Sequence, residues 1–344
     1  MFKQQHILAI LKCLTIGKLY NMLLVYTSFY LTKYLKKPIQ WGLPFSISIE
    51  PTTSCNLRCP ECPSGLRAFT RNTGMLEPAF FEKTIQEIKQ HLLYLTFYFQ
   101  GEPYLNRDFL KMVKVAKNNK IYTSTSTNGH YLTDAVAKET VVSGLDRLII
   151  SIDGTTQETY QQYRVGGHLD KVLEGTKNII KWKKALKSTS PYVIFQFLVV
   201  RHNEHQIEDL KKIAKEMQVD EVILKTAQVY NYENGNDLIP LQEKYSRYKK
   251  LSNGKYALKN KLDDACWKLW HSNAVTWDGK VVPCCFDKDA KHILGDLQKD
   301  SFQTIWHNQN YWNFRRQITK GRKEIDICRN CSEGCKVNFN VEID

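Results

Sequence analysis

Six short apolar, β-type runs alternate with stretches of helical apolar spacing through more than half of this chain of 344 residues. Such alternation predicts a parallel sheet with right-handed crossover connections. Six units indicate an α/β fold of the partial (β/α)6 TIM-like barrel type, because a complete barrel of this kind has about eight. The expected strands are residues 45–49, 94–99, 120–126, 146–151, 192–200 and 221–225.

Three cysteines follow the first expected strand with C-x3-C-x2-C spacing: Cys55, Cys59 and Cys62. Three thiolates this close can hold three corners of a cubic iron–sulfur cluster and leave the fourth iron open to a small molecule. An electron-carrying ferredoxin would supply a fourth cysteine nearby, whereas the next one here is Cys266. Zinc knuckles use similar spacings. The triad by itself therefore indicates either an iron–sulfur or a zinc centre.

Polar motifs stand at the ends of the next expected strands. They are Gln-Gly-Glu-Pro at 100–103, Thr-Asn-Gly at 127–129 and Ser-Ile-Asp-Gly at 151–154. In an α/β barrel, the loops that follow the strands form the active face. We therefore expect these motifs to meet the triad at one site, a combination that favours the cluster over zinc.

This combination resembles the radical S-adenosylmethionine (SAM) superfamily, over residues 44–335. The resemblance implies that the triad ligates a 4Fe-4S cluster whose open iron binds SAM. Reductive cleavage of SAM would then give a 5′-deoxyadenosyl radical that abstracts hydrogen from the substrate. In such enzymes the cofactor supplies the difficult chemistry and the protein supplies position.

The resemblance also assigns part of the SAM site to one loop. Gly101, Glu102 and Pro103 occupy the positions of the family's Gly-Gly-Glu-Pro motif, in which the carboxylate can accept hydrogen bonds from the SAM ammonium. Gln100 replaces the usual first glycine. Glu61 stands where many members carry an aromatic residue that packs on adenine.

The other implied SAM contacts come from later loops. Asn128 and Ser151 would face the ribose hydroxyls, and Asp153 continues the loop that begins at Ser151. Arg164 would pair with the SAM carboxylate. Each of these residues, taken singly, is more typical of a turn or a helix cap, so it is their order along the chain that indicates a cofactor site.

A second set of four cysteines lies in the carboxy-terminal part of the chain, and the set is Cys266, Cys284, Cys328 and Cys331. An Asp-Gly pair at 278–279 between two apolar arms predicts a β-hairpin, and a helix is expected at 301–317. This order resembles the SPASM/Twitch domain and implies a second, auxiliary 4Fe-4S cluster on these four cysteines. A structural zinc site is the alternative. Cys285 and Cys335 are either spectators or a spare pair of ligands.

The expected function is that of a radical SAM oxidoreductase acting on a sugar, or on an envelope-glycan or lipid-linked substrate, with the auxiliary cluster as electron acceptor. Asp287 is the candidate proton acceptor, whereas Asp278 is more typical of a turn. A flavodoxin or ferredoxin would donate electrons. The alternatives are a peptide- or protein-modifying maturase and, more remotely, a zinc-containing nucleic-acid-binding protein, which would explain the isoelectric point of 9.2 but not the strand-end motifs. We expect no nucleic-acid partner.

The amino-terminal segment has an unusual composition. Residues 1–49 hold six lysines and no acidic residue, and residues 7–35 are apolar and aromatic. Only 14 residues separate Lys18 from Lys33, whereas a membrane-spanning helix needs about 20. At 100° per residue, Lys18, Lys33, Lys36 and Lys37 share one arc. We expect either a helix lying in the surface of an anionic membrane or a helix packed under the barrel.

The chain is expected to divide into a helical segment at 1–43, a radical SAM barrel at 44–227, a linker with one helix at 228–262 and an auxiliary-cluster domain at 263–344. Ten cysteines without a recognisable signal peptide favour metal ligands over disulfides. The expected location is therefore the cytoplasm, with peripheral contact at the inner face of the membrane.

Overall fold

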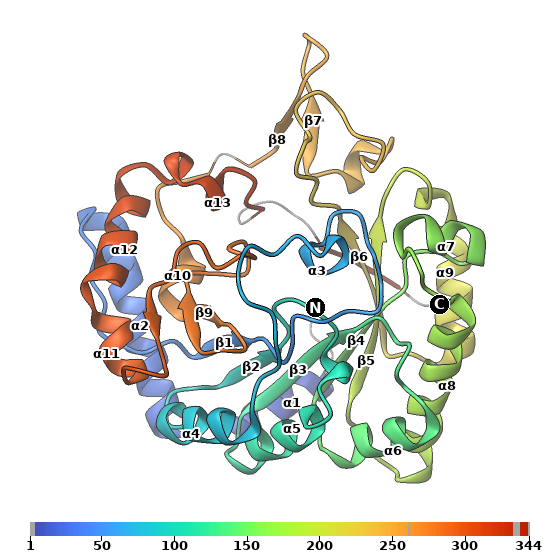
Figure 1. The fold of residues 1–344 in the computed structure, drawn as a ribbon, viewed down its shortest axis with the longest axis horizontal. Helices are drawn as coiled ribbons and strands as arrows, with labels where there is room; N and C mark the ends of the chain where they lie inside the picture. Colours follow the sequence, from blue (N-terminus) through green and yellow to red (C-terminus); the bar gives the residue numbers. More distant parts are fainter. Residues whose placement is uncertain (1–3, 261, 333–337, 343–344) are drawn as a thin grey trace.

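A ten-stranded sheet organises the molecule, in the order β11-β10-β9-β1-β2-β3-β4-β5-β6-β12 (Figure 1). The computed structural model describes residues 4–260, 262–332 and 338–342. Strands β1 to β6 all pair in parallel, which confirms the predicted α/β partial barrel. These strands are β1 Ser46–Ile49, β2 Tyr94–Phe97, β3 Tyr122–Thr127, β4 Arg147–Ser151, β5 Tyr192–Val199 and β6 Glu221–Thr226.

Helices cover the outer face of the curved sheet (Figure 1). Alternate strand residues, among them Ile47, Leu95, Leu148, Phe195 and Leu224, are buried against these helices and form the main core, because successive side chains of a strand point to opposite faces. The helices that follow the barrel strands are α4 Pro78–Ile88, α5 Phe109–Asn118, α6 Asp134–Val142, α7 Gln157–Tyr163, α8 Leu169–Ala185 and α9 Ile207–Met217.

The inner face of the barrel carries a polar row on its first three strands. Ser48 pairs with Thr96 and Thr96 with Ser124, so three hydroxyl side chains lie side by side on β1, β2 and β3. Adjacent strands are about 4.8 Å apart, which sets the spacing of this hydroxyl row. Two of its members, Ser48 and Thr96, are half-buried, whereas their sequence neighbours on the outer face are fully buried.

The carboxy-terminal segment extends the barrel's own sheet. The predicted hairpin is present as β9 Ser272–Val275 and β10 Lys280–Val282, followed by β11 Gly295–Asp296. Strand β9 pairs in parallel with β1, and β12 Asn338–Val341 pairs antiparallel with β6. The predicted helix 301–317 is two helices, α11 Phe302–His307 and α12 Gln309–Gly321, which lead to η4 Arg322–Glu324 and α13 Asp326–Arg329.

The segment expected as a linker contains a hairpin that the sequence did not lead us to expect. Strands β7 Tyr248–Lys250 and β8 Tyr256–Leu258 pair antiparallel and project from the barrel (Figure 1). Among the described residues of this segment, the one helical element is a 3-10 turn, η3 Glu243–Tyr245. Short elements also occur in the barrel loops: α3 Pro63–Leu66, η1 Pro103–Leu105 and η2 Glu204–Gln206.

The amino-terminal segment forms two helices, α1 Gln4–Cys13 and α2 Ile16–Leu35, at an angle of 104°. Within the described ranges, no single helix meets the length and hydropathy expected of a membrane span, although this bent pair does so when taken together. Lys18 does not belong to the expected exposed lysine arc. It is buried, and its ammonium donates to the carbonyls of Cys13 and Lys120, which fixes the start of α2 under the barrel.

A buried ion pair joins the barrel to the carboxy-terminal hairpin. Glu50 follows β1 and is fully buried; its two carboxylate oxygens accept hydrogen bonds from Arg71 at 2.6 and 2.8 Å. The same carboxylate accepts the backbone N–H of Trp277, in the β9–β10 turn, at 3.2 Å. Burial raises the pKa of Glu50, and Arg71 opposes that shift.

Replacing Arg71 by methionine should destabilise the protein by about 3–5 kcal/mol at pH 8, because the Glu50 carboxylate would stay buried without its partner. The loss should be smaller at pH 5, since a proton on Glu50, whose pKa is already raised by burial, then removes the unpaired charge. Thermal unfolding followed by circular dichroism at both pH values measures this.

The matched control is Lys111→Met, which removes an exposed pair with Asp108 and should change stability by less than about 1 kcal/mol. If the two variants unfold at the same temperature, the Glu50–Arg71 pair does not stabilise the junction.

Candidate active site

The cysteine triad lies in the loop that leaves the carboxyl end of β1. Cys59 is buried, and Cys55 and Cys62 are half-buried. Helix α3 begins directly after Cys62 and packs so tightly on the loop that a Cβ on Gly65 would lie 2.6 Å from the backbone nitrogen of Cys59. A glycine is therefore required at this position.

Hydrogen-bond donors lie near two of the three triad sulfurs. The N–H of Leu57 donates to Cys55 Sγ at 3.4 Å, and the side-chain amide of Asn128 lies 3.9 Å from the same atom. Arg164 lies 3.9 Å from Cys59 Sγ. Burial raises the pKa of Cys55 to about 12, so thiolate ligation would release protons. Donors aimed at sulfur are what the thiolates of an iron–sulfur cluster need.

The Gly-Glu-Pro loop after β2 is attached directly to the triad loop. Gly101 has φ +75°, and a Cβ there would lie 2.1 Å from the carbonyl oxygen of Thr52. Its N–H donates to Ser64 Oγ at 2.9 Å, and the N–H of Glu102 donates to the Ser54 carbonyl at 2.8 Å. Because residue 101 lies so close to the Thr52 carbonyl, only glycine fits at this position.

Glu102 is buried and connects the ends of β2 and β3. Its carboxylate accepts hydrogen bonds from Thr127 Oγ1 and the Asn128 N–H, both at 2.8 Å, and from the Tyr104 N–H at 3.3 Å. Burial raises the pKa of Glu102, and these hydrogen bonds offset only part of the rise, so the pKa is about 7. Pro103 follows as the first residue of η1.

The later strand-end residues lie at the same face of the barrel. The side-chain amide of Asn128 donates to Asn56 Oδ1 in the triad loop at 2.7 Å. Ser151 is the buried last residue of β4. The Asp153 carboxylate accepts a hydrogen bond from Arg164 Nε at 2.5 Å and another from the Leu198 N–H at 2.7 Å. Asp153 thus positions Arg164 rather than presenting a free carboxylate.

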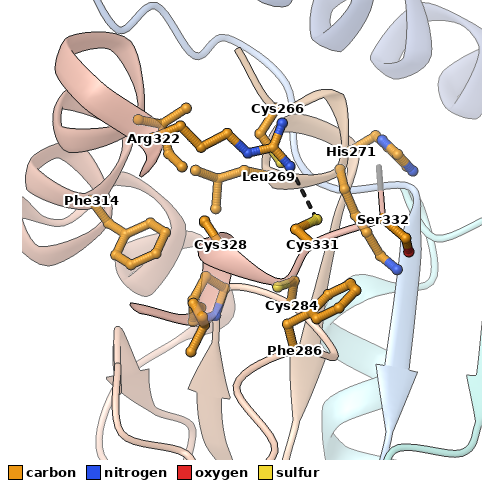
Figure 2. Close-up of a pocket in the computed structure, with 14 residues that line it drawn as sticks. Cys266, Leu269, His271, Cys284, Phe286, Phe314, Arg322, Cys328, Cys331 and Ser332 are labelled. Atoms are coloured by element: carbon orange, nitrogen blue, oxygen red, sulfur yellow. Dashed lines mark hydrogen bonds between the residues drawn. The ribbon is translucent and has the colours of Figure 1, made fainter. Parts of the chain in front are cut away.

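The second cysteine set converges on one cavity of about 390 Å³ (Figure 2). Segments far apart in the sequence contribute to it: Cys266 at the start of α10 Trp267–His271, Cys284 after β10, and the pair Cys328 and Cys331 around α13. Cys266, Cys328 and Cys331 are buried. Cys335 lies outside the described residues.

Two residues at this cavity were not anticipated from the sequence. Arg322 is buried, and its guanidinium donates to Cys331 Sγ at 3.2 Å (Figure 2). Lys268 also lines the cavity, and its ammonium lies 3.2 Å from Cys285 Sγ. Cys285 itself is absent from the cavity lining, so the structure separates the adjacent Cys284 and Cys285. No local sequence pattern marks either cation.

Within the part of the chain that the structure describes, no three His, Cys, Asp or Glu side chains lie close enough to hold one ion. Zinc ligands must all lie about 2.0–2.3 Å from one point. The cysteines of a cubic cluster instead bind separate irons.

Asp287 does not have the position expected of a proton acceptor. It is buried, and its two oxygens accept the backbone N–H groups of Lys291 and His292, each at 2.8 Å. The carboxylate therefore caps its own loop, a role that does not fit the proton acceptor expected from the sequence. Asp278 accepts from Thr276 Oγ1 at 2.6 Å in the hairpin turn, the turn role predicted for it.

Tyr98 directly follows β2 and retains 44% exposure. Its pKa is raised, chiefly by burial of the phenol and further by the thiols of Cys62, Cys285 and Cys55, whereas Arg164 lowers it. The phenol therefore interacts electrostatically both with the triad and with Cys285 in the carboxy-terminal segment.

Comparison with known proteins agrees with this geometry. The family model described as the radical SAM superfamily matches residues 49–214, and a model described as an iron–sulfur cluster-binding domain, SPASM, matches residues 266–332. The chain belongs to the radical SAM superfamily. Its cofactors are accordingly SAM, the SAM-binding 4Fe-4S cluster and an auxiliary 4Fe-4S cluster.

Individual radical SAM relatives are distant. The tungsten-containing aldehyde ferredoxin oxidoreductase cofactor-modifying protein of Pyrococcus furiosus is 26% identical over 86% of this chain and 90% of its own. Streptococcus suis SuiB bound to SAM is 14% identical with a TM-score of 0.62, covering 90% of this chain and 76% of SuiB. BtrN in complex with AdoMet and 2-DOIA is 17% identical with a TM-score of 0.50, covering 84% and 93%. These two structures show the shared fold.

Gly101→Ala should remove the SAM-binding cluster from the radical SAM site while sparing the auxiliary cluster. The added methyl would lie 2.1 Å from the Thr52 carbonyl and must displace the triad loop. We expect iron to fall from about eight to about four atoms per chain and SAM binding to be lost in anaerobic calorimetry.

The control is Gly254→Ala in the β7–β8 turn. Gly254 has a similar φ of +81° with nothing within 4 Å, so the variant has the same backbone strain without the clash. Equal iron contents in the two variants would contradict the proposed coupling of the two loops.

SAM affinity should rise with pH across the pKa of Glu102. Its pKa is raised to about 7, so the carboxylate that would accept the SAM ammonium is protonated below that pH and ionised above it. We expect SAM to bind more tightly at pH 8 than at pH 6 in calorimetric titrations, with a flat profile in Glu102→Gln. A wild-type profile as flat as that of the variant would exclude Glu102 as the titrating acceptor.

Proposed function

We propose that this radical SAM enzyme is an oxidoreductase that converts an alcohol to a carbonyl on a sugar-like substrate, free or carried by an envelope glycan or lipid. The observation that carries the proposal is the hydroxyl row of Ser48, Thr96 and Ser124 on the inner face of the barrel. Such a row can donate hydrogen bonds to, and accept them from, a polyhydroxylated ligand.

Two sets of ligands support this chemistry. We assign the SAM-binding cluster to Cys55, Cys59 and Cys62, and the auxiliary cluster to Cys266, Cys284, Cys328 and Cys331. When bound, these cofactors supply the electron that cleaves SAM, the hydrogen-abstracting radical and an acceptor for the electron that the substrate loses.

The protein's own part is to position SAM and to hold the substrate. We assign Glu102, in the loop 101–103, to the SAM ammonium. We assign Arg164 to the SAM carboxylate; the hydrogen bond of 2.5 Å from Arg164 Nε to Asp153 orients its guanidinium. Asn128 and Ser151 are assigned to the ribose. We also assign Tyr98 to the substrate, because its phenol interacts electrostatically with the triad thiols and with Cys285.

Oxidation of an alcohol removes one hydrogen atom, one electron and one proton, so an acceptor for the proton is needed. Lys225 is our candidate in place of Asp287. It lies on the half-buried face of β6, opposite to the core residues Val222 and Leu224. Burial lowers its pKa, and a lysine with a lowered pKa can act as a base near neutral pH.

A peptide substrate is the second candidate. SuiB, with which this chain shares its fold, has also been solved with its precursor peptide SuiA, so this architecture can accept a peptide.

We place the enzyme in the cytoplasm, where thiols stay reduced and where a flavodoxin or ferredoxin can donate electrons.

Anaerobic purification tests the proposal. The protein should be brown, with about eight irons per chain, and with SAM and reductant it should release 5′-deoxyadenosine, faster with sugar nucleotides or envelope glycans than with peptides. The product should weigh two hydrogens less than the substrate.

Two cluster-directed variants distinguish the roles. Replacing the triad by alanines should leave about four irons and no SAM cleavage, whereas Cys328→Ala/Cys331→Ala should leave about four irons and cleave SAM without giving oxidised product. Faster turnover with peptides, or a product of unchanged mass, would overturn the oxidoreductase proposal while leaving the radical SAM chemistry intact.

A further inference from the structure

Helix α2 has its polar side buried and its apolar side exposed. The side facing the protein consists of Lys18, Asn21, Val25, Ser28 and Thr32, spaced by three and four residues as on one helix face. The outward side is aromatic and aliphatic. Its exposed residues are Ile16 (87%), Leu19, Tyr20 (62%), Leu23 (62%), Tyr26, Tyr30, Tyr34 (86%) and Leu35.

The buried side is firmly bound, so the exposed apolar side is not a result of loose packing. The side chain of Asn21 makes two hydrogen bonds of 2.8 Å with the backbone of Leu43. Thr32 Oγ1 accepts the Ile39 N–H at 2.9 Å and donates to the Ile39 carbonyl at 3.2 Å. Val25 belongs to the main core. These contacts fix which side of α2 faces outward.

Helix α1 adds Ile7, Leu8 and Leu11, which are also exposed. We call the exposed apolar residues of α1 and α2 together the apolar face. More than half of the large hydrophobic side chains exposed in the described residues lie within the first 41 positions. A concentration of this kind marks an interaction site on a folded protein.

We propose that the apolar face docks the protein on the surface of a bilayer that contains anionic lipids. Tyrosine is enriched at the membrane–water boundary, where its ring lies in the apolar layer and its hydroxyl reaches water. Four of the outward residues of α2 are tyrosines. An interface with a second protein would not require that composition.

The exposed lysines of the amino-terminal segment favour lipids with anionic headgroups. Lys12, Lys33, Lys36 and Lys37 are exposed beside the apolar face, and residues 1–49 contain no acidic residue. Lys33 and Lys36 share a cavity of about 480 Å³ with Asp263, Asp264 and Glu324, which offsets part of their charge. Lys12 and Lys37 lie outside that cavity, so they are the lysines we assign to anionic headgroups.

The first part of the docking surface lies at the end of the barrel opposite to the SAM site. Lys18, at the start of α2, binds the carbonyl of Lys120 just before β3, and Cys13 packs on Leu93 and Tyr122 at the amino ends of β2 and β3. The triad and the Gly-Glu-Pro loop follow the carboxyl ends of strands. Strands β1, β2 and β3 have four to six residues and span about 13–20 Å, which separates this part of the docking surface from the SAM site. The later part of α2 lies beside α10, where the ring centroids of Tyr26 and Trp267 are 5.4 Å apart.

Vesicle co-sedimentation of the full-length, cluster-loaded protein tests the docking. The protein should bind vesicles of phosphatidylcholine with phosphatidylglycerol, and bind less well to phosphatidylcholine alone and at high salt. Tyr20→Glu/Leu23→Glu should weaken binding by about tenfold or more. Lys12→Glu/Lys37→Glu should remove the preference for the anionic lipid.

Leu241→Glu is the matched control, because Leu241 is 75% exposed but lies outside the apolar face; it should bind as the wild type does. Iron content and SAM cleavage should stay unchanged in all variants, which separates this proposal from that of the reaction. Absence of wild-type binding to either vesicle, or equal binding by Tyr20→Glu/Leu23→Glu, would overturn the proposal. The proposal would also be overturned if light scattering showed a wild-type dimer and a monomeric Tyr20→Glu/Leu23→Glu variant, because the apolar face would then be an interface between two copies of the chain.

Discussion

The double pairing of strand β1 is the constraint on which the rest of the structure depends. β1 hydrogen-bonds to β2 on one side and to β9 on the other, so the strand that leads into the triad also carries the hairpin that leads into Cys284. The Glu50–Arg71 pair, with Trp277 bound to the same carboxylate, fastens this junction at the carboxyl end of β1. Because one rigid sheet holds both cysteine sets, their separation does not depend on a flexible linker between domains.

Loops on that sheet build the radical SAM site by contacts between neighbouring strand ends. Gly101 lies against Thr52, Glu102 receives the N–H of Asn128, and Asn128 reaches Asn56. Each loop is therefore positioned by the next rather than by its own turn. This explains why a carboxylate can stay buried here: three donors offset the cost of removing Glu102 from water, and its pKa nevertheless rises to about 7.

The amino-terminal helices pack on the barrel with one side and expose the other side to solvent. The sequence offered membrane contact and packing under the barrel as alternatives, whereas the structure packs the polar side of α2 on the protein and leaves its apolar side outward. A buried lysine is tolerated because two backbone carbonyls receive its ammonium.

The sequence by itself determined the order of strands and helices, the spacing of the triad and the strand-end motifs, because periodicity and ligand spacing are local properties. It predicted six parallel strands, the β9–β10 hairpin and the four cysteines that line one cavity. Only the tertiary structure decided that Cys284 and Cys285 face different surroundings, that Asp287 caps its own loop, that Lys225 lies on the inner side of β6 and that Lys18 is buried. These properties arise from burial and from hydrogen bonds between residues far apart in the chain, which no local pattern records.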